Sequence, residues 1–108
     1  SKSYSAHVPI VHNVSERELS NVFPLLKKIR EDKFLKMHVV AIYRNAEKSY
    51  ELELRTNAFR LVIGKIEDIN RKIKNFKAFY QKASKDKTLN KYKKVSLQYN
   101  NQVVCTFK

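Results

Sequence analysis

The order of hydrophobic periodicities along the chain limits its fold more than any other feature. Residues 37–44, 50–55 and 59–63 form three consecutive runs with strand-like composition, and the middle one alternates apolar and charged side chains without a break. Apolar residues at helical spacing precede these runs at 19–29 and follow them at 66–80. Segregated strands with two amphipathic helices predict an α+β domain, with a mainly antiparallel sheet of about five to six strands and both helices packed on it.

Local signals mark where the two predicted helices begin and break. Ser15 and Glu18 form the S-x-x-E pattern of a capping box ahead of the first helix. Pro24 lies inside that helix and predicts a kink or a split, because its ring clashes with the preceding turn and its nitrogen donates no hydrogen bond. Asp68 lies at the start of the second helix, where the helix dipole favours acid. Lys72 is assigned to the polar side of that helix.

Strand signals also occur near both ends of the chain. The apolar segment His7–Val11 predicts an edge strand or an extended lead-in, because Pro9 cannot donate to a β-ladder. Val95–Tyr99 alternates, Asn100–Asn101 can turn the chain, and Gln102–Phe107 predicts a closing strand. If that closing strand lies at the rim of the sheet, its unpaired backbone groups form a template for a partner strand. The alternative is an edge that simply ends the domain.

Length and charge set the scale of the molecule. The chain has 108 residues, which suits one domain over residues 1–108. Twenty-three Lys and Arg against ten Asp and Glu give a net charge of +13. This charge predicts attraction to something anionic, such as nucleic acid, the lipid headgroups of a membrane surface, an acidic protein or a charged polymer of the cell-wall surface. No nucleic-acid-binding motif accompanies the charge, so a basic module that binds nucleic acid, an anionic polymer or a membrane surface stays as the alternative function.

No set of residues typical of catalysis is visible. The histidines are His7, His12 and His38. His38 is assigned to the start of a strand, and the spacing of the other two is not that of a metal pair. Glu51 and Glu53 share one strand face, where Arg55 and Arg60 are expected to balance their charge across the hairpin. We therefore predict a protein that is not an enzyme and holds no cofactor or metal.

Several segments resemble one bacterial protein family. Asn90–Cys105 closely resembles the end of FtsQ (DivIB-like) proteins of the Bacteroidetes type, where N-K-Y-x-x-I-x-L-x-Y is followed by N-Q-V-V-C. Tyr4–Val11 is similar to the segment that follows the POTRA domain in that family. Leu52–Gly64 resembles the family's hairpin, and Lys72 with Phe79–Tyr80 resembles its helix. The resemblance covers nearly the whole chain, and the last run is its specific part.

The resemblance implies a fold, a role and a location. The matching part of the family is the C-terminal periplasmic β domain, so the transmembrane helix and the POTRA domain are expected to lie outside this sequence. The family implies a non-enzymatic divisome scaffold on the periplasmic side of the inner membrane, at the septum. It implies binding to FtsB and FtsL by strand addition, which links early and late division proteins. The sequence departs from the family near Asn57, where the family usually has Gly, and at Leu89, where it usually has Trp.

The same resemblance implies where a partner would bind. In the family the partner pairs with the last strand of the β domain, and Tyr99 and Phe107 would then serve as aromatic anchors beside the paired backbone. Asn100 and Asn101 would flank the contact. The implied partner-binding residues are Tyr99, Asn100, Asn101, Gln102, Val103, Val104, Cys105, Thr106 and Phe107.

Overall fold

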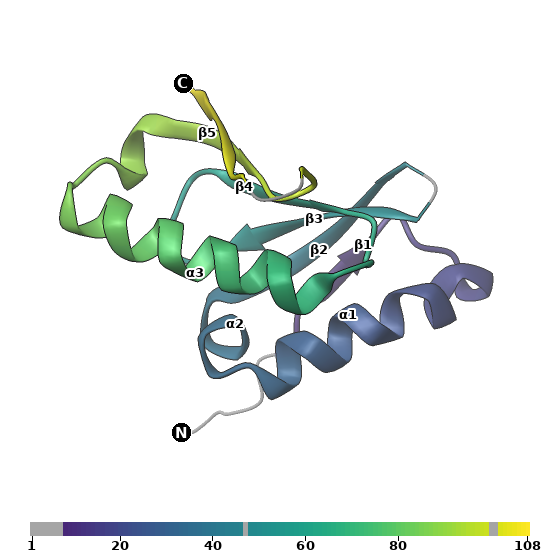
Figure 1. The fold of residues 1–108 in the computed structure, drawn as a ribbon. Helices are drawn as coiled ribbons and strands as arrows, with labels where there is room; N and C mark the ends of the chain where they lie inside the picture. Colours follow the sequence, from purple (N-terminus) through teal and green to yellow (C-terminus); the bar gives the residue numbers. More distant parts are fainter. Residues whose placement is uncertain (1–7, 47, 100–101) are drawn as a thin grey trace, which may run out of the picture.

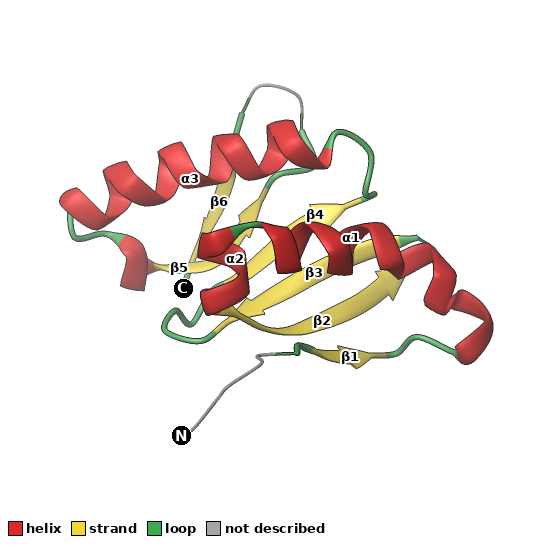
Figure 2. Cartoon of the chain, turned by 90° about the horizontal axis from the view of Figure 1, so that it is seen from below, coloured by secondary structure: helices red, strands yellow, loops and turns green. Residues whose placement is uncertain are grey.

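The protein forms two layers, a six-stranded sheet and a set of helices that cover one of its faces (Figures 1 and 2). The structure is a computed structural model, and it describes residues 8–46, 48–99 and 102–108. The predicted α+β class is confirmed. The domain measures 40 × 37 × 24 Å along its principal axes, which gives it the shape of a flat slab.

Within the described residues, three α-helices and two short 3-10 turns make up the helical layer. Their bounds are η1 Glu16–Glu18, α1 Leu19–Glu31, α2 Lys33–His38, α3 Ile69–Lys85 and η2 Leu89–Lys91. The capping box is confirmed: the Glu18 amide donates to Ser15 Oγ at 3.3 Å, and the Ser15 amide donates to Glu18 Oε1 at 3.1 Å. The box caps η1, which leads directly into α1.

The six strands that the structure describes all belong to one sheet, in the spatial order β1-β2-β3-β4-β5-β6. Their bounds are β1 Ile10–His12, β2 Val39–Ala46, β3 Ser49–Leu54, β4 Arg60–Gly64, β5 Tyr92–Ser96 and β6 Val104–Phe107. The sheet is mixed rather than purely antiparallel, because β1 pairs with β2, and β4 with β5, in parallel. Helices separate the strands of both parallel pairs along the chain. Such a crossover carries the chain back to the end of the sheet at which the first strand of the pair started. The second strand therefore runs in the same direction as the first.

Helix α2 is the element that the sequence pattern does not predict. Residues 37 and 38 end this helix instead of beginning a strand, so the placement of His38 in a strand is wrong. Asp32 caps the helix, since its Oδ1 accepts the Leu35 amide hydrogen at 3.0 Å. Strand β2 begins directly after the helix at Val39.

Pro24 does not split the first helix. It lies within the single helix α1, which runs on to Glu31. The helix buries Val22, Leu25 and Ile29 against the sheet. Pro24 is exposed on the opposite side.

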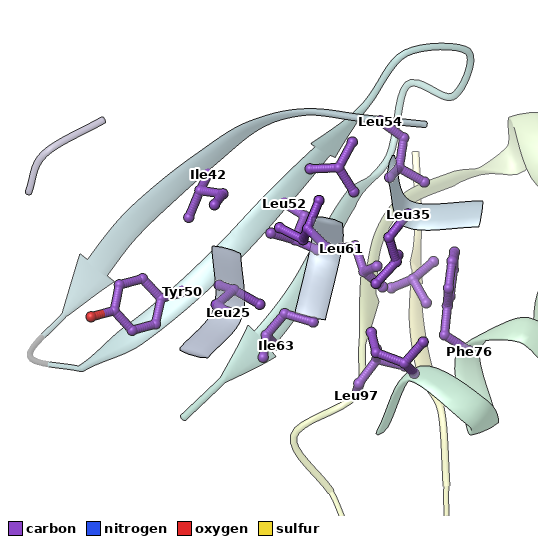
Figure 3. Close-up of a cluster of buried hydrophobic side chains, with 14 of the residues drawn as sticks. Leu25, Leu35, Ile42, Tyr50, Leu52, Leu54, Leu61, Ile63, Phe76 and Leu97 are labelled. Atoms are coloured by element: carbon purple, nitrogen blue, oxygen red, sulfur yellow. The ribbon is translucent and has the colours of Figure 1, made fainter. Parts of the chain in front are cut away.

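The hydrophobic core lies between the sheet and the helices (Figure 3). Tyr50, Leu52 and Leu54 of β3 all point into it, as their alternation predicts. Phe76 of α3 is fully buried, and its ring meets those of Phe34, Phe59, Phe79 and Tyr80 at centroid distances of 5.6–6.5 Å. This aromatic cluster ties α2 and α3 to the sheet.

Candidate partner-binding edge

Strand β6 lies at one edge of the sheet. It pairs antiparallel with β5, in a register that sets Val95 opposite Cys105 and Ser96 opposite Val104. Among the strands that the structure describes, β5 is its one neighbour. The predicted closing strand is thus present at a rim, although it is shorter than expected, since Gln102 and Val103 precede it. Short β1 forms the opposite edge, as one of the two readings of the first segment predicts.

The backbone of β6 offers hydrogen-bonding groups to the side away from β5. The Lys108 amide donates to the Lys91 carbonyl at 3.0 Å, so this amide points toward β5. N–H groups of alternate residues in a strand point in opposite directions. We therefore infer that Thr106 and Val104 face β5, whereas Cys105 and Phe107 present their N–H and C=O groups to the open edge.

Apolar side chains surround this edge. Phe107 is 65% exposed, Tyr99 48% and Val104 39%, which are high values for large apolar residues in an 108-residue domain. The ring of Phe107 packs on the ring of Tyr92, with centroids 5.4 Å apart. The Tyr92 ring in turn packs on Phe79 of α3, with centroids 5.5 Å apart. Phe107 is therefore anchored by this ring contact with Tyr92 while most of its surface is open to solvent.

The other residues implied at this site differ in accessibility. Gln102 and Thr106 are exposed, and Val103 is half-buried against the core. Cys105 is half-buried too, and this burial raises the pKa of its thiol, which keeps it protonated at neutral pH. Asn100 and Asn101 lie outside the described residues, so their predicted turn stays a prediction.

The edge has a basic border. Lys91, Lys93, Lys94 and Lys108 are all exposed and lie on or next to β5 and β6. Lys94 stands opposite Thr106 in the sheet register. A partner with acidic side chains would meet complementary charge here.

Lys72 is buried, so its predicted place on the polar side of the helix is wrong. Its Nζ donates to the carbonyls of Ile63 at 3.1 Å and Lys65 at 2.6 Å, which joins α3 to the end of β4. Burial lowers the pKa of this amine, and the carboxylates of Asp68 and Glu67 partly oppose that effect. A signal was present in the spacing, because Lys72 precedes the buried Phe76 by one helical turn.

The sheet face opposite the described helices carries a polar cluster. The Tyr43 hydroxyl donates to Glu53 at 2.8 Å, and this hydrogen bond raises the pKa of Tyr43. The guanidinium of Arg60 lies 4.0 Å from the centroid of the same ring and pairs with Glu51 at 3.4 Å. His12 stacks on Tyr43 with ring centroids 4.4 Å apart. Both glutamates are thus engaged across strands.

The predicted balance of charge on this face is confirmed for Arg60. Arg60 does pair with Glu51. Arg55, the other predicted cation, donates from Nε to the Met37 carbonyl at 3.3 Å.

The described part of the chain holds neither a cluster of metal ligands nor a membrane-spanning helix. In residues 8–46, 48–99 and 102–108, no three His, Cys, Asp or Glu side chains gather in a way that could hold a metal ion. Over the same residues, none of the helices has the length and apolar character needed to cross a bilayer.

Comparison with known proteins identifies the family. The model of the family described as FtsQ/DivIB, C-terminal related, matches residues 1–106, almost the full length of the chain. A comparison with curated proteins gave no match. The family match confirms the resemblance seen in the segments Tyr4–Val11, Leu52–Gly64 and Asn90–Cys105. The chain therefore belongs to the FtsQ/DivIB C-terminal related family, a family of cell-division proteins.

Proposed function

We propose that this domain is a non-enzymatic scaffold module of the bacterial divisome that binds FtsB and FtsL by strand addition at β6. The family supports the role in cell division. The observation that carries the proposed site is the edge position of β6 beside the exposed, anchored ring of Phe107. In this role the domain works on the periplasmic side of the inner membrane, at the septum, and connects early with late division proteins.

The short edge limits what backbone pairing alone can contribute. Two outward-facing residues, Cys105 and Phe107, offer about four hydrogen bonds, each worth roughly 0.5–1.5 kcal/mol net. Ordering a partner segment costs energy of similar size. Side-chain anchors must therefore supply much of the affinity, and exposed aromatics at the edge suit this role. Phe107 lies in β6, and Tyr99, also exposed, precedes that strand along the chain.

The lysine border supplies a second element of recognition. Exposed lysines around an interface attract an acidic partner and accelerate its association, with an effect that falls as salt rises. An FtsB or FtsL segment that pairs with β6 is therefore expected to carry Asp or Glu within reach of the basic border that includes Lys94 and Lys108. Its association rate should decrease between low and physiological ionic strength.

Isothermal titration calorimetry with the periplasmic parts of FtsB and FtsL tests the proposal. The test variant combines Tyr99→Ala with Phe107→Glu. Loss of a hot-spot aromatic costs roughly 2 kcal/mol or more, so the double variant should bind at least about 30-fold more weakly. The matched control is Phe23→Glu, which places the same charge at an exposed Phe of helix α1.

Both variants are compared by circular dichroism, so that loss of folding is separated from loss of binding. Equal affinity of the wild type and the double variant would refute the β6 site and leave the family assignment intact. Equal weakening by Phe23→Glu would show that the partner occupies a different surface. Absence of any binding by the wild-type domain would refute the proposed partners.

A further inference from the structure

The outer surface of the helices carries a large share of the domain's positive charge. Eight exposed Lys and Arg side chains lie on α1, α2 and α3, against one exposed carboxylate, Glu31. They are Lys27, Arg30, Lys33, Lys36, Lys74, Lys77, Lys82 and Lys85. Lys77 and Lys82 pair with Asp32 and Asp86. The other six form no ion pair with any residue of the described ranges.

The arrangement of the helices places these cations on one face. All three helices cover the same side of the sheet and can be seen together when the molecule is viewed from that side (Figure 2). Within α1, Lys27 lies one turn from Phe23, on the side opposite the buried Val22, Leu25 and Ile29. Helix α3 contains six basic residues and no acidic one. We call the outer surface of α1, α2 and α3 the helix face.

Apolar side chains project among the cations of the helix face. Phe23 on α1 is 54% exposed, and Met37 on α2 is 60% exposed. Phe23 lines a shallow hollow with Lys27 and Arg30, and Met37 lines another with Lys33 and Lys77. Exposed cations that alternate with projecting apolar groups are typical of surfaces that lie on membranes, where the apolar groups enter the interface between headgroups and acyl chains.

The shape of the domain favours a planar partner over a soluble polyanion. The slab is 24 Å thick and 40 × 37 Å across, so the layer of helices forms one of its broad faces. Six unpaired cations spread over three helices match an extended anionic surface. A soluble polyanion such as duplex DNA would be held by charge alone and would gain nothing from Phe23 and Met37.

We propose that the helix face docks on a bilayer containing anionic phospholipids, with the cations at the headgroups and Phe23 and Met37 inserted between them. This orientation places the sheet away from the bilayer and leaves β6 at the rim of the slab. The domain can therefore bind lipid and a partner strand together. The inference does not depend on the proposed partner site, because it rests on different residues.

Co-sedimentation with vesicles of phosphatidylcholine and about one quarter phosphatidylglycerol tests the proposal. Each Lys near an anionic surface contributes a factor of about five to the partition coefficient. The helix-face variant Lys27→Gln, Lys36→Gln, Lys74→Gln should therefore bind roughly 100-fold more weakly. The matched control is Lys91→Gln, Lys93→Gln, Lys94→Gln, which removes the same net charge from exposed positions outside the three helices and should retain most of the binding.

A second pair of measurements separates lipid from a soluble polyanion. The variant Phe23→Ser, Met37→Ser keeps the charge and should weaken vesicle binding while leaving any binding to duplex DNA unchanged. The helix-face variant and the variant Phe23→Ser, Met37→Ser should both keep the affinity of the wild type for FtsB and FtsL. Failure of the partner experiment with intact lipid binding would thus refute the proposed partners or the β6 site and leave the lipid proposal standing.

Three results would overturn the proposal. The first is equal loss by the helix-face variant and its matched control, which would show that net charge acts without a preferred face. The second is equal binding of the wild type to purely phosphatidylcholine vesicles. The third is binding to duplex DNA as strong as binding to vesicles, together with no effect of Phe23→Ser, Met37→Ser, which would identify a generic polyanion surface.

Discussion

Asp32 connects helices α2 and α3 through two interactions, a helix cap and an ion pair. The loss of stability on replacing Asp32 can therefore be divided between the two. Its Oδ1 accepts the Leu35 amide at the start of α2, and its Oδ2 pairs with Lys77 of α3 at 2.6 Å. Loss of an Asp N-cap costs about 1 kcal/mol. The ion pair adds at most about 1 kcal/mol, because Lys77 is half in solvent. We expect Asp32→Ala to lower the free energy of unfolding by roughly 1–2 kcal/mol.

The two contributions separate in urea unfolding followed by circular dichroism. Asp32→Asn keeps a capping oxygen and removes the charge, so it should cost less than Asp32→Ala. Lys77→Ala removes the ion pair alone and should cost less than about 1 kcal/mol. The matched control is Asp86→Ala, which removes an exposed aspartate at the end of α3 that pairs with Lys82 at 3.5 Å, and it should be near neutral.

The contribution of Asp32 to the free energy of unfolding should also depend on pH, in a direction that can be measured. Burial by itself would raise the pKa of Asp32, but the hydrogen bonds from Lys77 and the Leu35 amide, with the charges of Lys77 and Lys28, outweigh it and lower the pKa. A carboxyl with a lowered pKa in the folded state stabilises the protein above its unfolded pKa of about 3.9. This contribution is lost as pH falls through the folded pKa. Asp32→Asn should therefore destabilise at pH 7 and have little effect in strong acid.

The reasoning on Asp32 would be refuted by equal stabilities of Asp32→Ala and Asp86→Ala at pH 7. An Asp32→Asn variant as unstable as Asp32→Ala would refute the capping contribution alone.

Three further outcomes follow from single positions. Phe76→Ala should cost about 3–5 kcal/mol in urea unfolding, because Phe76 is fully buried, whereas Phe23→Ala at an exposed site should cost less than about 0.5 kcal/mol; similar values would contradict the assignment of the core. Gly64→Ala should lower the free energy of unfolding by at least about 1–2 kcal/mol, because φ of Gly64 is +70° and the added Cβ would lie 2.9 Å from Cβ of Gln98. An unchanged free energy of unfolding would contradict this strain. Cys105 should react more slowly with a thiol reagent in the native protein than in urea, because burial raises its pKa, and equal rates would contradict that burial.

Strands were predictable where one face alone is buried. Tyr50, Leu52 and Leu54 alternate with charged residues, and all three are buried as that pattern requires. The closing strand before Lys108 was predictable for a similar reason, since its β-prone residues end the chain. The two parallel pairings could also have been predicted, because a helical segment separates the strands of each pair along the sequence.

Other features depend on tertiary contacts that a local pattern does not contain. Helix α2 has six residues, too few for a helical period to be recognised beside the β-branched residues of strand β2. Its one local signal is the cap formed by Asp32 and the Leu35 amide. Lys72 has the composition of a surface residue, and its burial depends on the carbonyls at the end of β4, which a helix pattern does not reveal. The clustering of cations on one helix face likewise depends on how α1, α2 and α3 pack together.

Hydrogen exchange of the backbone amides tests the proposed partner site most directly. A strand added to the open edge would accept hydrogen bonds from the amides that face away from β5. The account predicts that saturating FtsB and FtsL segments slow the exchange of the Cys105 and Phe107 amides at least about tenfold, with small changes at Val104 and Thr106, which are already paired with β5. Protection that appears at β1 or on α1 instead, with Cys105 and Phe107 unchanged, would contradict strand addition at β6.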